Sequence, residues 1–81
     1  MDMLQLRPVN AQIYAVHTAN GDHVGYLKHI GTVWKFKAVG HGAHGELEPG
    51  GGPLTDRHNT VFDAPDPAMV SARLTVDRTQ D

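Results

Sequence analysis

The sequence predicts a small α+β domain in which an antiparallel β-meander of three or four strands packs against one short C-terminal helix. Apolar and polar residues alternate over 11–39, as is typical of strands buried on one face. The dipeptide Asn20-Gly21 and the glycine at position 31 mark the turns between these strands. Asp66-Pro67 indicates a helix start, because Asp is a favoured N-cap and Pro a favoured first helical residue.

The chain has 81 residues, fewer than the ~100–150 of a typical domain, and is expected to form a single small domain. A core of this size is marginally stable, so a metal ion or a second subunit would be a natural supplement. We expect a lead-in over 1–10, the meander over 11–39, a glycine-rich loop over 40–53, short helical or strand segments over 54–76 and a tail over 77–81.

The first hairpin joins a strand over 11–18 to a strand over 22–30. Asn-Gly suits a two-residue turn because both of its positions need a positive φ. Such a turn at Asn20-Gly21 pairs Thr18 with His23, Val16 with Gly25 and Tyr14 with Leu27.

Two registers are open for the second hairpin, whose last strand covers 32–39. A loop at Ile30-Gly31 places Leu27 opposite Trp34 and Gly25 opposite Phe36. A loop at Gly31-Thr32 places Lys28 opposite Lys35. Like charges directly opposite destabilise a sheet, so we expect the first register.

Either register gives the sheet one apolar and one solvated face. The predicted core face carries Tyr14, Val16, Leu27, Trp34, Phe36 and Ala38. The predicted solvated face carries Ala15, His17, Val24, Tyr26, Lys28, Lys35 and Lys37.

The second half of the chain has weaker patterns. Six glycines and two prolines predict a long flexible segment over 40–53, with a short strand at Glu46–Glu48 inside it. Residues 54–62 fit either a helical turn or a strand at Thr60–Phe62. The helix predicted at Ala68–Leu74 has a rival, because residues 70–76 also alternate as a strand does; the Asp-Pro start signal favours the helix.

Composition excludes several classes of protein. The chain has no cysteine, which excludes disulfides and thiolate chemistry. No apolar run approaches the ~18–20 residues that span a bilayer, and no secretory signal pattern is present, so we expect a soluble cytoplasmic protein without membrane contact. The net charge of −2 argues against a dedicated nucleic-acid binder.

Six histidines are the compositional anomaly of the chain. His41, His44 and His58 flank the glycine-rich segment and are candidate ligands for Zn²⁺ or Ni²⁺, which bind neutral imidazole. The alternative is a solvated polar loop that needs no cofactor. His23 and His29 are expected near the ends of the core face, and titration of all six near neutral pH would allow pH sensing.

Aromatic residues interleave with lysines along the second and third predicted strands. Tyr26, Lys28, Lys35 and Lys37 share the solvated face, where they are candidates for stacking bases and contacting the phosphates of single-stranded nucleic acid.

Groups for catalysis are few. The chain has one serine, Ser71, and the carboxylates Glu46 and Glu48 share a face if that segment is a strand. A chain of this size has little room for a water-excluding pocket, so we expect no enzyme. We expect instead a binding or accessory module that acts through protein contacts or forms a homodimer at an exposed sheet edge. The alternatives are a histidine-based metal binder and a weak binder of single-stranded nucleic acid.

Overall fold

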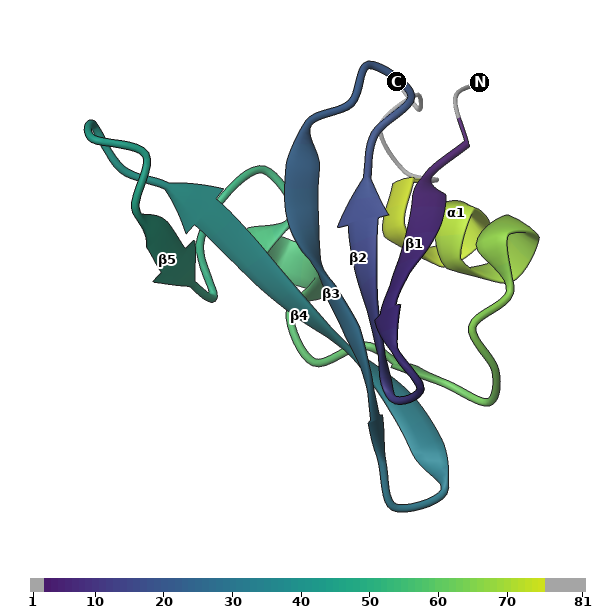
Figure 1. Cartoon of the computed structure of the whole chain (residues 1–81). Helices are drawn as coiled ribbons and strands as arrows, with labels where there is room; N and C mark the ends of the chain where they lie inside the picture. Colours follow the sequence, from purple (N-terminus) through teal and green to yellow (C-terminus); the bar gives the residue numbers. More distant parts are fainter. Residues whose placement is uncertain (1–2, 76–81) are drawn as a thin grey trace.

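The computed structural model describes residues 3–75 and has the predicted fold class (Figure 1). One antiparallel sheet contains six strands in the described residues, in the order β1-β2-β3-β4-β5 with β6 also paired to β4. The strands are β1 (Gln5–Asn10), β2 (Ile13–His17), β3 (His23–Ile30), β4 (Val33–His41), β5 (Leu47–Pro49) and β6 (Val61–Phe62). A 3₁₀ turn, η1 (Thr55–Arg57), precedes β6, and one helix, α1 (Pro67–Thr75), ends the described chain. This α+β fold is confirmed, and its sheet is larger than the predicted meander.

Residues 5–10 form strand β1, so the expectation of an irregular lead-in over 1–10 is wrong there. Leu6 lies opposite Val16 and packs against the core, while the preceding Leu4 is buried in it. Pro8 does not prevent the strand, because β1 is at the edge of the sheet, where a missing N–H is tolerated.

The first hairpin has the predicted pairs Tyr14–Leu27 and Val16–Gly25. The predicted Thr18–His23 pair is wrong, because a bulge places His17 opposite His23. Val24, the extra residue of the bulge, is buried in the core, although alternation predicts it on the solvated face.

In the second hairpin Lys28 lies opposite Lys35 and Leu27 opposite Phe36, so the register we expected is wrong. Turn geometry explains the difference. A loop at Ile30-Gly31 would require a left-handed backbone at Ile30, whereas in the observed loop Gly31 takes that conformation, with φ of 63°. Left-handed backbone costs a side-chain-bearing residue about 1–2 kcal/mol, more than the ~0.2–1 kcal/mol scale of a cross-strand pair.

The glycine-rich segment is a short β-hairpin rather than a loop without structure. Strand β4 continues to His41, a turn follows, and β5 returns along β4 close to the predicted short strand. We call residues 41–52 the β5 arm. Its glycines allow close contact: a Cβ on Gly52 would collide with the carbonyl oxygen of Val39.

Residues 54–62 contain both of the alternatives left open by the sequence, a helical turn at η1 and a strand at β6. The helix prediction is confirmed, and its N-cap is the predicted one: the Ala68 N–H donates to the Asp66 carboxylate (3.0 Å). No helix in residues 3–75 has the length and apolar character needed to cross a bilayer. The predicted tail over 77–81 lies outside the described residues.

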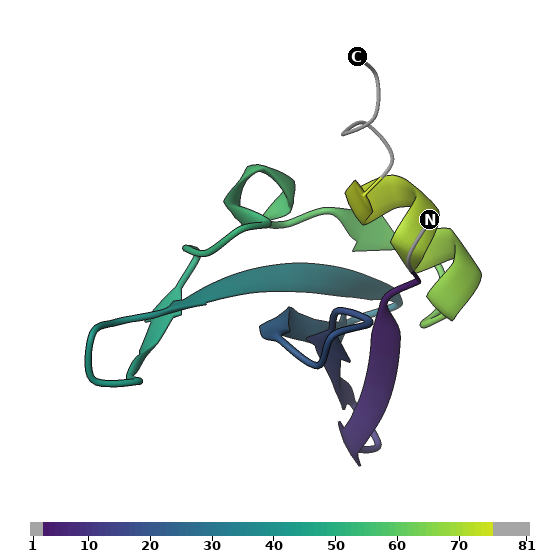
Figure 2. The ribbon, with the colours of Figure 1, turned by 90° about the horizontal axis from the view of Figure 1, so that it is seen from above.

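The core lies between the sheet and the segments that follow β5. In Figure 2, η1, β6 and α1 lie on one side of β4, and the β5 arm extends on the other. The predicted core face is confirmed, with Tyr14 and Trp34 partly buried. Residues before β1, in the bulge of β3, in β6 and in α1 add to this face and complete the buried core. The buried core residues are Leu4, Val16, Val24, Leu27, Phe36, Ala38, Phe62, Val70 and Leu74.

Candidate functional site

Strand pairing gathers the basic side chains of the sheet on the face opposite the core. Directly paired residues share a face, and pairs in this sheet include Arg7–Ala15, Ala15–Tyr26 and Tyr26–Lys37. Extending these pairs defines what we call the basic face: Arg7, His17, His23, Tyr26, Lys28, Lys35, Lys37 and His41. It holds four of the seven Lys and Arg residues of the chain, including all three lysines.

No carboxylate from strands β1 to β5 accompanies these cations. The five strands contain one acidic residue, Glu48, and it lies opposite Gly40 on the core-side face. Its neighbours Leu47 and Pro49 lie opposite His41 and Val39, on the basic face. The local charge of this face is therefore positive although the whole chain carries −2.

The lysines lie close together without acidic partners. Lys28 and Lys35 are directly opposite, a destabilising arrangement for two like charges, and Lys37 lies one alternation further along β4. Lys37 Nζ donates to the Asn59 side-chain oxygen (2.6 Å). Within residues 3–75 none of the three ammonium groups forms an ion pair with a carboxylate. An anion bound here would relieve the repulsion between them.

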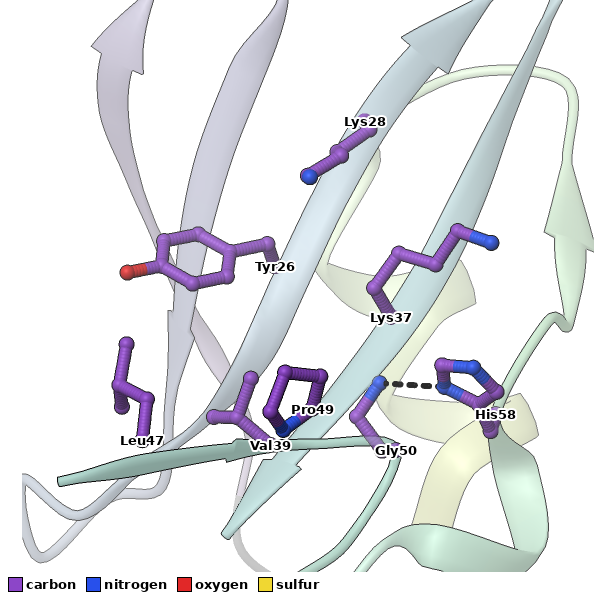
Figure 3. A pocket seen from close by; sticks show the side chains of 9 residues that line it. Tyr26, Lys28, Lys37, Val39, Leu47, Pro49, Gly50 and His58 are labelled. Atoms are coloured by element: carbon purple, nitrogen blue, oxygen red, sulfur yellow. Dashed lines mark hydrogen bonds between the residues drawn. The ribbon is translucent and has the colours of Figure 1, made fainter. Parts of the chain in front are cut away.

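A pocket of about 350 Å³ opens on the basic face beside these lysines. This volume is near the lower end of the ~300–1,000 Å³ range of small-molecule sites. Figure 3 shows Tyr26 on one side, Lys37 and His58 on the other, and Pro49 between them. The lining is mostly apolar apart from these groups and Lys28, and comprises Tyr26, Lys28, Lys37, Ala38, Val39, Leu47, Pro49, Gly50 and His58.

His58 forms part of the pocket wall and closes a gap in the edge of β4. Strand β6 covers this edge at residues 34–35, and β5 covers it at residues 39–41. Between them the Ala38 N–H donates to His58 Nδ1 (3.0 Å), the bond dashed in Figure 3. Because Nδ1 accepts this bond, a neutral His58 carries its proton on Nε2.

Three histidines and a tyrosine form a group of ring contacts at the end of the basic face. The His23 ring stacks on His17 with centroids 5.0 Å apart, and it makes edge contacts with Tyr26 (4.7 Å) and His41 (5.9 Å). The bulge puts His23 here and not at the end of the core face, where it was predicted. Burial, with Arg7 and His23 nearby, lowers the pKa of His17 below its usual value of 6.5.

The three histidines proposed as metal ligands lie in different environments. His41 ends β4 and contacts His23, His44 is in the exposed turn of the β5 arm, and His58 Nδ1 is hydrogen-bonded to the backbone. No three His, Cys, Asp or Glu side chains of residues 3–75 form a group that could hold a metal ion. A Zn²⁺ or Ni²⁺ site at these histidines stays a prediction from sequence.

The remaining candidate groups are engaged in local structure. Ser71 is buried in α1, where its hydroxyl accepts the N–H of Leu4 (2.8 Å). The Glu46 carboxylate accepts the N–H of His44 (3.1 Å) and lies outside β5. His29 stacks on Trp34, with centroids 4.6 Å apart, on the predicted core side of the sheet.

Self-association through a sheet edge also stays a prediction. Strand β1 ends the sheet, and most of its side chains are exposed. Its Arg7 and Pro8 are residue types that protect edges from uncontrolled pairing.

Sequence reasoning identified Tyr26 and the three lysines, and it named His41 and His58 only as metal ligands. It did not place Leu47, Pro49 or Arg7 at the site. Leu47 and Pro49 reach the pocket only because the β5 arm folds back along β4, and Arg7 joins the face only because β1 exists. The apolar–polar–apolar alternation of Leu47, Glu48 and Pro49 is the sequence pattern that could have indicated a strand with Leu47 and Pro49 on one apolar side.

No protein-family model matches the chain, and the comparisons with curated proteins and with solved structures find no match.

Proposed function

We propose that this chain is a non-enzymatic binding module that holds an anionic partner on the basic face of its sheet. The observation that carries the proposal is the segregation of charge: three lysines and one arginine share the basic face with no strand carboxylate, and two of the lysines line a pocket there. The close Lys28–Lys35 pair supports it, because an anion placed between two ammonium groups offsets their repulsion.

The proposal refines the class expected from sequence. A module acting by contact with another macromolecule needs an exposed surface of defined chemistry, and here that surface is cationic with an apolar recess. An acidic protein segment and a nucleic acid both have the chemistry that would recognise it.

An amide-correlation NMR titration with a heparin hexasaccharide, a polyanion without aromatic rings, tests the proposal. We expect the largest shift changes at residues 26–28 and 35–37, and their loss as salt is raised, because exposed charge interactions are screened. The triple variant Lys28→Gln, Lys35→Gln, Lys37→Gln should bind at least about tenfold more weakly, given the ~1.4 kcal/mol that separates tenfold affinities.

A second triple variant provides the matched control. Ala64→Glu, Ala68→Glu and Ala72→Glu change the net charge by the same three units at exposed positions outside the sheet. This variant should keep the wild-type pattern of shifts. If both variants lose affinity equally, the net charge and not the basic face governs binding, and the proposal is wrong.

A further inference from the structure

We infer that the anionic partner is single-stranded nucleic acid, with one base held in the pocket beside Tyr26 and its flanking phosphates on the lysines. This inference rests on the proposed function and assigns the ligand class of the same site. The inference depends on two features that lie among the lysines: flat aromatic and imidazole rings, and the apolar walls of the pocket. A partner that offers only carboxylates would need neither of them.

The pocket has the parts that a base requires. Tyr26 supplies an aromatic ring at one side, and Leu47 and Pro49 supply apolar walls from the β5 arm (Figure 3). Bases stack on aromatic side chains regardless of their sequence, because every base has a π-face. The Nε2–H of a neutral His58 is a donor in the pocket wall that a base carbonyl can accept from.

The charges have the arrangement that a phosphate backbone requires. Lys28 and Lys37 line the pocket, and Lys35 lies directly across from Lys28, so cations continue along β3 and β4 beyond the pocket. A chain of phosphates can contact successive ammonium groups while the attached bases turn toward the sheet.

The ring contacts extend the surface for stacking beyond Tyr26. His23 touches Tyr26, His17 and His41, so flat side chains continue from the pocket toward the end of the sheet. Lysines interleaved with flat rings on one sheet face are the combination that single-strand binders use. An acidic peptide would pair with the lysines but would leave the rings and the apolar recess without a role.

The test compares three fluorescent probes by anisotropy at low salt: the oligonucleotide dT8, an abasic strand with the same number of phosphates, and an octaglutamate peptide. We expect dT8 to bind at least about fivefold more tightly than the abasic strand, since stacking contributes roughly 5- to 150-fold per base. If the three lysines each neutralise one phosphate, log affinity should fall against log salt with a slope of about −2.

Two substitutions at Tyr26 isolate the stacking contribution. Tyr26→Leu keeps apolar bulk but removes the ring, and should abolish the advantage of dT8 over the abasic strand. Tyr26→Phe keeps the ring and should preserve it. Circular dichroism of both variants checks that the sheet is intact.

The outcomes separate the inference from the proposed function. Equal affinity for dT8 and the abasic strand, unchanged in Tyr26→Leu, would overturn the inference and leave an anion-binding face. Tighter binding of octaglutamate than of dT8 would also overturn it and would indicate an acidic protein partner. Failure of every polyanion to bind, the heparin hexasaccharide included, would reject the proposed function itself.

Discussion

His17 lies at the border of the basic face with its Nδ1 atom buried and without a hydrogen-bond partner among the described residues. Burial lowers the pKa of this imidazole, and Arg7 and His23 lower it further. The unfolded chain then binds more protons than the folded chain as pH falls through the ordinary value of 6.5, so acid reduces stability. Above that value His17 is neutral in both states and contributes no pH dependence.

We therefore expect the free energy of unfolding to fall between pH 7.5 and pH 5.5, and the fall to be smaller in His17→Asn. Urea denaturation at the two pH values measures this difference. The control is His44→Asn, which changes an exposed imidazole in the turn of the β5 arm and should keep the wild-type dependence. Equal slopes in the wild type and His17→Asn would contradict the assignment.

Gly25 illustrates how one residue without a side chain fixes the packing of the core. A Cβ at this position would lie 2.5 Å from two ring atoms of Phe36 and 2.6 Å from the Lys37 carbonyl oxygen. Phe36 is fully buried, so its ring cannot move without disturbing other core residues.

Gly25→Ala should lower the free energy of unfolding by about 1–3 kcal/mol or more, as overpacking a core does. Urea denaturation followed by Trp34 fluorescence measures the change. Gly51→Ala is the matched control, because a Cβ there meets its nearest atom at 3.5 Å, an ordinary contact. A Gly25→Ala protein as stable as the control would show that the Phe36 ring can shift freely.

Strand β4 organises the elements of the fold, because its two edges are covered by different means. Strand β3 pairs with one edge; the other is covered by β6, the Thr60 and Asn59 backbone, the His58 ring, Gly50 and β5. The imidazole thus replaces a backbone acceptor where no strand is available, which satisfies the Ala38 N–H.

Removing that acceptor should destabilise the edge. We expect His58→Phe, which keeps a ring of similar size, to lower the free energy of unfolding by about 1–3 kcal/mol, the cost of an unsatisfied buried donor. Hydrogen exchange at the Ala38 amide should also become faster. His44→Phe, at an exposed position, is the control for adding an apolar ring, and unchanged exchange at Ala38 would contradict the role of His58.

Elements with strong local signals were predictable from the sequence. The Asp66-Pro67 helix start depends on neighbouring residues alone and lies where it was expected. A turn also forms near Asn20-Gly21, but it is not the predicted two-residue turn: the Gly21 N–H donates to the Thr18 carbonyl, so Ala19 and Asn20 are its central residues, and Gly21 but not Asn20 has a positive φ. The register expected for the second hairpin is wrong, because the turn's need for a positive φ at Gly31 outweighs the charge repulsion between Lys28 and Lys35. The β5 arm and β1 are held in place by pairing with other strands. Local sequence patterns therefore do not predict that Leu47 and Pro49 form a wall of the pocket or that Arg7 joins the basic face.

At the scale of the whole molecule the charges are segregated, although the chain carries only −2 in total. The acidic residues of the described chain lie outside the basic face, in turns, in η1, before α1 and at Glu48. A net charge near zero therefore conceals a surface of one sign, which can attract a polyanion and raise its rate of association. For this reason a net charge of −2 does not exclude nucleic acid as a partner of this face.

Acidification should strengthen polyanion binding through the same face. Imidazoles gain charge as pH falls through neutrality, and protonation of all six histidines would change the net charge from −2 to about +4. Two of them, His23 and His41, lie on the basic face with Tyr26 beside them, whereas burial keeps the pKa of His17 on the same face below its usual value.

We expect the affinity for the heparin hexasaccharide to be higher at pH 6.0 than at pH 7.5 at low salt, because a more positive chain attracts a polyanion more strongly. The double variant His23→Gln, His41→Gln should flatten this rise. The double variant His29→Gln, His44→Gln removes as many imidazoles from outside the basic face and should retain it. If the two variants respond to pH alike, the histidine contacts lie away from the bound anion, and the lysines alone hold it.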